Sequence, residues 1–175
     1  MSEMPRAEAR PPSPLDQVFD PDRNPELFEG VLSRRIVAFL IDAVIVIGPI
    51  ILLSLFIFVF GLITLGIGWL LFWLLSPIFV IWAIVYVGTT LGSPASATMG
   101  MRAMDLEMRI WNGGRMYFLL GAVHAIFFWV ITGALSPLVH LVALFNRRRR
   151  LLQDFLTGTV LINNERRAAA LRRPR

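Results

Sequence analysis

Asp42 is the one charged residue in an apolar stretch of 52 residues that runs from Ile36 to Val87. A carboxylate at the centre of a membrane's apolar layer costs about 2.5–3.5 kcal/mol, so it is expected to find a partner or to take up a proton. Acidic groups inside membranes commonly bind protons or cations. Asp42 is therefore the first candidate for chemistry in this chain.

Arg35 precedes Asp42 by seven residues, which is nearly two helical turns and about 10 Å, so both side chains leave the same helix face. Side chains lean toward the N-terminus of their helix, so Arg35 leans away from Asp42 and a direct pair is strained. We expect an arginine from elsewhere in the chain to pair with Asp42. The candidates are Arg147 and Arg148 of the basic cluster 147–150, and Arg102 and Arg109 nearer the middle.

Two histidines, His124 and His140, lie in a later apolar block and form a candidate proton relay with Asp42. A lone histidine in such a block is more often an interhelical hydrogen-bond donor, and both interpretations stay open. The chain has no cysteine, no glycine-rich phosphate loop, no zinc-binding helix motif and no nucleophile elbow. We therefore predict no catalytic residue, cofactor or metal site, and we do not expect an enzyme.

The elements that position these residues follow from the apolar runs. About 20 apolar residues cross a bilayer as a helix, so the stretch 36–87 predicts two crossings. It divides at 61–68, where three glycines interrupt the apolar sequence. This places helix one at 36–60 and helix two at 69–87. Over 102–110 apolar and polar residues alternate, and an Asn-Gly-Gly turn follows, which predicts a surface strand and turn.

A third apolar block, 117–145, is interrupted by polar and small residues around 133–137. A single crossing would put Arg35 and the cluster 147–150 on opposite faces and nearly cancel the positive-inside bias. A re-entrant hairpin turning near 133–137 would place these arginines on one face, and we favour it. The predicted fold class is an all-α membrane protein with two transmembrane helices, a surface strand-turn loop, and a third block that is a re-entrant hairpin or a single span.

Three motifs, taken in order, resemble the RDD family of membrane proteins. They are Arg34-Arg35-Ile-Val-Ala-Phe-Leu-Ile-Asp42, the segment from Ser93 to Arg102, and the segment from Phe145 to Thr159. The similarity spans about 30–162 and implies that Arg35, Asp42 and Asp154 are the residues for which the family is named. We expect these three to form an intramembrane polar network, because a re-entrant third block brings Asp154 to the mouth of helix one. For some members ion or small-solute transport is suggested.

The chain departs from the family pattern at two places. The family often has Thr-Pro-Gly-Lys where this chain has Ser93-Pro94-Ala95-Ser96, and histidine often precedes the second aspartate where Gln153 stands here. The resemblance therefore implies no lysine or histidine role at these positions. It supplies an expectation about the fold more than about a mechanism.

The chain divides into three parts. These are a disordered, proline-rich N-terminal tail at 1–29, a membrane domain at 30–162 with the loop 88–116 between its second and third apolar segments, and a basic C-terminal tail at 163–175.

Two functional hypotheses stay open. The first is a small transport-related protein in which Asp42 handles a cation or proton, and the second is a non-transporting scaffold or assembly factor that docks a partner complex. The charge pattern indicates contact with anionic lipid headgroups and no nucleic acid. Because three or four short helices enclose little space, we expect a homo-oligomer or a larger membrane complex. The expected location is the bacterial cytoplasmic (inner) membrane, with the N-terminus cytoplasmic.

Overall fold

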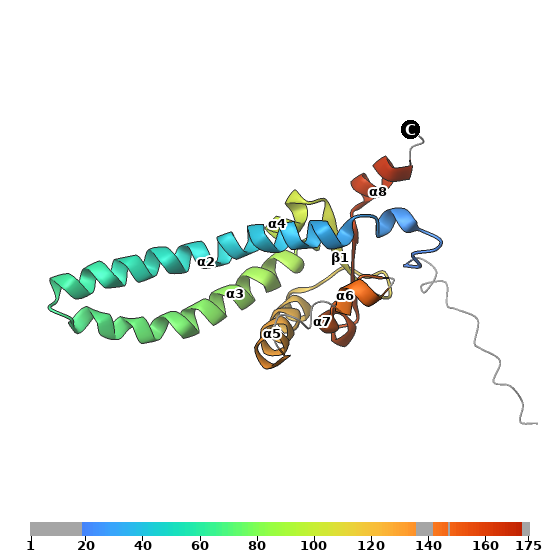
Figure 1. Ribbon diagram of the computed structural model, residues 1–175. Coiled ribbons are helices and arrows are strands. Elements are labelled where there is room, and N and C mark those ends of the chain that lie inside the picture. The colour runs from blue at the N-terminus through green and yellow to red at the C-terminus, as the bar shows by residue number, and fades with distance from the viewer. Residues whose placement is uncertain (1–18, 136–141, 147, 173–175) are drawn as a thin grey trace, which may run out of the picture.

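The computed structural model describes residues 19–135, 142–146 and 148–172. A long helical hairpin projects from one end of the molecule, and the shorter helices and a small sheet gather at its base (Figure 1). In chain order the elements are η1 (Pro25–Leu27), α2 (Val31–Ile63), η2 (Ile67–Leu74), α3 (Leu75–Leu91), α4 (Met99–Ala103), β1 (Leu106–Ile110), α5 (Phe118–Leu135), α6 (Val142–Phe145), α7 (Leu152–Leu156), β2 (Thr159–Asn163) and α8 (Glu165–Arg172).

Three helical segments of the described chain are long and apolar enough to cross a membrane. They are Pro25–Ile63, Ile67–Leu91 and Phe118–Leu135. The first two form the hairpin, and the chain reverses at Thr64–Gly66, within the stretch where glycines interrupt the sequence. Leu65 and Gly66 both have left-handed backbone angles there, with φ of 54° and 97°. This membrane-spanning helical architecture is the predicted fold class.

α5 packs against α3 through small residues. A Cβ added at Gly92 would lie 2.6 Å from the backbone nitrogen of Phe118, and one added at Gly88 would lie 2.9 Å from the Phe118 ring. Further along, Phe79 and Trp129 meet edge to face with ring centroids 5.3 Å apart. α5 therefore begins beside the end of α3 and runs antiparallel to it. Its helix includes Gly133, and residues 136–141, where the rest of the expected reversal falls, lie outside the described residues.

The strand predicted over 102–110 begins later, at Leu106, because Thr98 caps α4 and keeps Met99–Ala103 helical. β1 pairs antiparallel with β2, with Leu106 opposite Asn163 and Met108 opposite Leu161. The sequence did not indicate this partner. The predicted surface turn is present, with Gly113 at φ 86°. It is closed by the bridge between Arg109 and Arg115 and by a hydrogen bond from the Ile110 N–H to the Gly114 carbonyl oxygen at 3.0 Å.

The main core lies at the base of the hairpin, where α2, α3 and the sheet meet. Its buried side chains are Val31, Ala38, Leu91, Leu106, Met108, Met116 and Leu161. Two elements of the long hairpin are thus joined to the strands by apolar contact. Because Val31 and Ala38 of α2 lie in this core, the packing fixes where Arg35 and Asp42 stand relative to the sheet and α3.

The structure differs from the predicted tail over residues 19–29. Phe19 and Phe28 are buried against Val160 and Ile162 of β2, because the apolar side chains find a cover there. Residues 1–18 of that tail lie outside the described chain. In the predicted basic tail at 163–175, residues Glu165–Arg172 form α8, and Arg172 contacts Glu26 at 2.6 Å.

Candidate functional site

Asp42 lies where α2, α3 and the start of α4 meet. Its Oδ1 accepts hydrogen bonds from the Tyr86 hydroxyl at 2.6 Å and from the Gly100 N–H at 2.8 Å. Its Oδ2 accepts one from the Thr98 hydroxyl at 2.5 Å. All three donors are neutral, so within the described chain the carboxylate is hydrogen-bonded without a balancing cation.

The Asp42 site depends on a close approach between α4 and α2. A Cβ added at Gly100 would lie 2.1 Å from the Ala38 carbonyl oxygen and 2.9 Å from Cγ of Asp42. Only glycine lets the Gly100 N–H reach the carboxylate. Thr98 is at the same time the N-cap of α4, and its hydroxyl oxygen accepts from the Met101 N–H at 3.2 Å.

Asp154 occupies a second and different site, formed by α7 against α2. Its two carboxylate oxygens accept from Nη1 and Nη2 of Arg35 at 2.5 and 2.9 Å, which is a bidentate ion pair. The Asp154 side chain is 0% exposed and that of Arg35 is 11% exposed. The Leu151 N–H donates a further hydrogen bond to Asp154 at 2.8 Å.

The electrostatics of the second site favour the ionised acid. Burial by itself raises the pKa of Asp154, but the charge and hydrogen bonds of Arg35 outweigh it, so the pKa lies below its ordinary value. Arg150 lies beside this site, where its Nη2 donates to the backbone carbonyl oxygen of Asp154 at 2.8 Å and its guanidinium lies over the Phe155 ring. Burial lowers the pKa of Arg150.

Of the three network residues, the structure brings together Arg35 and Asp154 and leaves Asp42 apart. None of the candidate arginines that the structure describes pairs with Asp42, because Tyr86, Thr98 and Gly100 supply neutral donors at that position instead. Arg102 binds the Ala97 carbonyl and the Ser93 hydroxyl, at 3.1 and 2.6 Å. Arg109 pairs with Glu107 at 3.2 Å. Arg148 has no ion pair within the described chain, and Arg147 lies outside it.

The histidine relay with Asp42 is not formed by the described residues. His124 is buried beside the other aspartate, with Nε2 3.7 Å from Asp154 and Nδ1 3.3 Å from the Thr157 hydroxyl. His140 lies outside the described residues. Gln153, which stands where the family often has histidine, is also buried, and its Oε1 has no partner in the described chain.

Sequence reasoning missed Tyr86, Thr98 and Gly100 as partners of Asp42. Tyr86 stands near the end of an apolar run, where a tyrosine is typical of an interfacial anchor, and a buried hydrogen-bonding tyrosine gives the same sequence signal. Thr98 and Gly100 fall in the middle motif of the family resemblance, and this motif was the sequence feature that could have pointed to them. A threonine two residues before a glycine has no specific meaning by itself.

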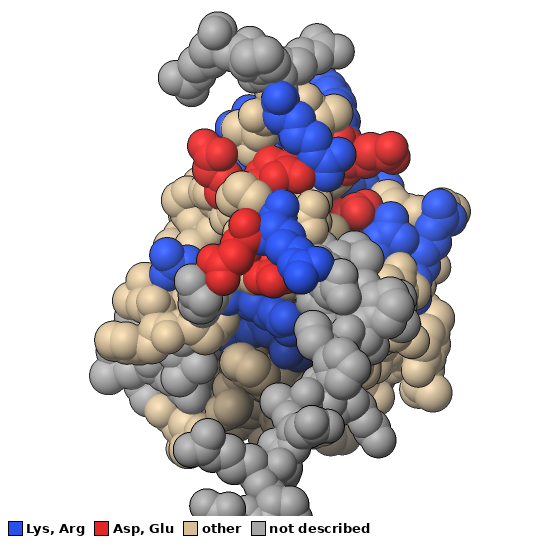
Figure 2. Space-filling model, turned by 90° about the vertical axis from the view of Figure 1, so that its right-hand side faces the viewer, with Lys and Arg blue, Asp and Glu red and all other residues tan. Residues whose placement is uncertain are grey.

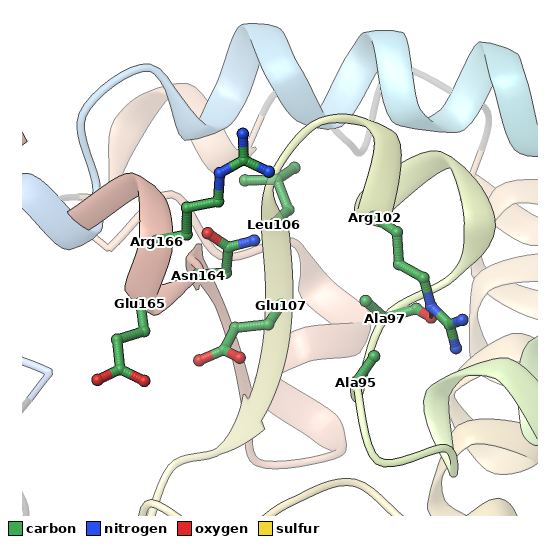
Figure 3. A pocket seen from close by; sticks show the side chains of 8 residues that line it. All are labelled: Ala95, Ala97, Arg102, Leu106, Glu107, Asn164, Glu165 and Arg166. Carbon is green, nitrogen blue, oxygen red and sulfur yellow. Dashed lines mark hydrogen bonds between the residues drawn. The ribbon is translucent and has the colours of Figure 1, made fainter. Parts of the chain in front are cut away.

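Outside the apolar helices, a groove of about 310 Å³ opens between α4, β1 and α8. Arg102 and Arg166 stand on opposite sides of it, with Glu107 and Asn164 between them (Figure 3). Ala95, Ala97 and Leu106 give it an apolar floor. Basic and acidic side chains are interleaved over this end of the molecule (Figure 2). The mixed charge favours no single sign of ligand.

Apolar helices of membrane-spanning length, with a small polar end built from loops and a two-stranded sheet, define an integral membrane protein. The model of the RDD family matches residues 30–158, which is most of the chain. The chain belongs to the RDD family. Comparison with curated proteins and with solved structures found no match.

Proposed function

We propose that this protein has a transport-related role in which Asp42 binds a proton or a monovalent cation. The observation that carries the proposal is the contrast between the two aspartates. Asp154 is neutralised by Arg35, whereas in the described part of the chain Asp42 meets the neutral donors Tyr86, Thr98 and Gly100 and no cation. A carboxylate without a counter-charge near an apolar layer favours the uptake of a positive ion.

The chemistry of the Asp42 site suits a small, singly charged ion. Carboxylate and hydroxyl oxygens are hard ligands, which bind protons and hard cations. In the part of the chain that the structure describes, no group of three or more acidic, histidine or cysteine side chains converges. One carboxylate balances one positive charge, so we favour a proton or a monovalent cation over a divalent one.

The proposed transport role requires more than one copy of the chain or a partner protein. A single copy of three apolar helices encloses little space for a pathway, so we propose that copies associate or join a larger membrane complex. We place the protein in the bacterial cytoplasmic membrane with its arginine-rich end in the cytoplasm, following the positive-inside rule.

The substitution Asp42→Asn tests this function in proteoliposomes. We expect the variant to fold and insert but to lose flux driven by a proton, sodium or potassium gradient, read with an internal pH-sensitive dye for protons and with internal sodium- and potassium-sensitive dyes for the cations. Asp105→Asn is the matched control, because Asp105 pairs with Arg34 outside the apolar run and its loss leaves Asp42 untouched. Flux by Asp42→Asn at the level of the parent protein would rule the proposal out.

A scaffold role is the second candidate, and the groove between α4, β1 and α8 favours it. That groove offers charges of both signs over an apolar floor at the polar end of the molecule, which suits a protein partner (Figure 3). For a scaffold, Asp42→Asn should change abundance or partner retention and no ion flux should exist to be lost. Glu107→Gln with Arg166→Gln should then weaken co-purification of the partner.

A further inference from the structure

The chain forms a closed turn between α6 and α7. The Asn146 side chain donates to the Arg150 carbonyl oxygen at 2.6 Å and accepts from the Arg150 N–H at 2.8 Å. The Arg149 N–H donates to the Asn146 carbonyl oxygen at 3.0 Å. Both backbone groups of Arg150 are thus bound by one amide, which fixes the turn that carries Arg148 and Arg149.

The arginines of this turn carry positive charge that no described acid balances. Arg148 makes no ion pair or hydrogen bond within the described residues, and Arg149 donates to the Leu144 carbonyl oxygen at 3.0 Å. The nearest acid along the chain, Asp154, is already bound by Arg35. The turn therefore presents a net positive charge.

Exposed apolar side chains flank the same turn. Leu144 and Phe145 precede it and Phe155 and Leu156 follow it, and all four are exposed, Phe145 to 88%. Among the described residues, none of them belongs to a helix that is long enough to cross a membrane. Large apolar side chains beside unbalanced arginines are typical of a segment that lies in the headgroup region.

The depth of the segment is set by an independent contact. Arg35 is the last charged residue before the apolar stretch of α2 begins at Ile36, so it marks the boundary of the apolar layer. The ion pair with Asp154 holds α7 at the level of Arg35. The turn and its apolar neighbours consequently lie where phosphates and the upper acyl chains meet.

We propose that the described residues 144–146 and 148–156 form a binding surface for anionic phospholipid. Arg148 and Arg149 bind the headgroup phosphates, and Leu144, Phe145, Phe155 and Leu156 enter the upper acyl layer. The occupant is a lipid surface because charge and apolar area lie side by side at the membrane boundary. The inference is independent of any ion binding at Asp42.

Lipid selectivity tests the charge. The protein is reconstituted with spin-labelled phosphatidylglycerol or spin-labelled phosphatidylcholine, and the motionally restricted fraction of each is compared by electron paramagnetic resonance. Arg148→Gln with Arg149→Gln should reduce the preference for phosphatidylglycerol several-fold, and by up to about thirtyfold at low salt. Arg166→Gln with Arg172→Gln removes the same charge from α8 and should leave the preference unchanged. An equal loss in both double variants, or no loss in the first, overturns the proposal.

Depth is tested separately, so that a poorly folded arginine variant does not decide the question. The chain has no cysteine, so a nitroxide can be attached to Phe145→Cys and, as a control on α8, to Ala170→Cys. The label at 145 should collide more with oxygen than with a water-soluble nickel complex, and the label at 170 should show the reverse. Equal access of the nickel complex to both positions means that the segment faces water or a protein, and it overturns the proposal.

Discussion

The two aspartates that distinguish this sequence have opposite electrostatic settings although both are tied to α2. Asp154 is fully buried and bound in two places by a guanidinium, whereas Asp42 is bound by two hydroxyls and one amide. A bidentate pair fixes geometry, because both charges lose their partner if either side chain moves. A carboxylate that is held by neutral groups keeps an unbalanced negative charge, which can attract a proton or a cation. This difference separates a structural acid from a candidate ion-binding acid.

Removal of the buried pair should be strongly destabilising. Asp154→Asn leaves the Arg35 guanidinium without a counter-charge, which costs about 3–5 kcal/mol in buried pairs. Because the folded-state pKa of Asp154 is lowered, its contribution is present above the unfolded-state pKa and is lost as pH falls through the folded-state value. We expect the melting temperature of the parent protein in detergent to decrease once the pH is lowered past about 4. The melting temperature of the variant should depend less on pH. An Asp154→Asn protein as stable and as acid-sensitive as its parent would contradict this.

Gly100→Ala should disturb the Asp42 site through the backbone. The new Cβ would meet the Ala38 carbonyl, so α4 must move away from α2 and the hydrogen bond from the Gly100 N–H to Asp42 is lost. We expect a loss of about 1–3 kcal/mol in the free energy of unfolding. Gly133→Ala is the control, because a Cβ there meets nothing within 4 Å. In a double-mutant cycle with Asp42→Asn the losses should be less than additive, and full additivity would show that the two residues act separately.

At the scale of elements, the α2–α3 hairpin depends on how its turn is closed. Trp69 lies over Gly61, and its indole N–H donates to the Phe58 carbonyl at 3.2 Å. A Cβ at Gly61 would lie 1.9 Å from the Trp69 ring. The three glycines that mark the turn in the sequence therefore have different roles, since Gly66 supplies a left-handed backbone angle and Gly61 supplies space.

Gly61→Ala should lower the free energy of unfolding by about 1–3 kcal/mol, because Trp69 must leave its position. Gly48→Ala on the same helix has open space around its Cβ and should be neutral or stabilising by up to about 1 kcal/mol. Thermal unfolding of both variants, followed by circular dichroism in the same detergent, checks the contrast. Equal effects of the two substitutions would show that the contact between Gly61 and Trp69 does not matter.

The predictable elements are those with a local signal. The apolar runs predicted the membrane helices, and alternation predicted the strand at Leu106–Ile110. Its partner β2 could not be predicted, because all five residues of Thr159–Asn163 are buried and show no alternation. Likewise, the family resemblance grouped Arg35, Asp42 and Asp154 in one network, but it indicated neither that Arg35 pairs with Asp154 nor which groups donate to Asp42. Tyr86 and Gly100 reach Asp42 only through the packing of three helices, which no sequence period records.

At the scale of the whole molecule, both described ends of the chain lie at the base of the hairpin. α8 lies beside η1, where Arg172 binds Glu26 and the Asn163 side chain donates to the carbonyls of Glu26 and Glu29 (Figure 1). The hairpin turn lies at the opposite end of the molecule. We therefore expect the two described ends to lie on one face of the membrane.

Single cysteines test this arrangement with an impermeant thiol reagent on intact and permeabilised cells. Asp22→Cys and Ala170→Cys should react from the same side, and Leu65→Cys, at the exposed hairpin turn, from the other. The chain's own lack of cysteine makes each label unique. Opposite sides for positions 22 and 170 would contradict the fold, and labelling of 65 from the same side as 22 would show that the hairpin does not cross.

The ion pair between Arg35 and Asp154 joins residues 119 positions apart, and this separation bears on biogenesis. At a ribosome speed of about 5–20 residues per second, roughly 6–24 s pass between the synthesis of the two. Throughout that interval the nascent first helix holds an unmatched guanidinium at the bilayer edge. The ion pair forms only after the last apolar segment has reached the membrane. A chain that is halted before Asp154 is therefore inserted without this ion pair, and we expect quality-control proteases to degrade it more readily.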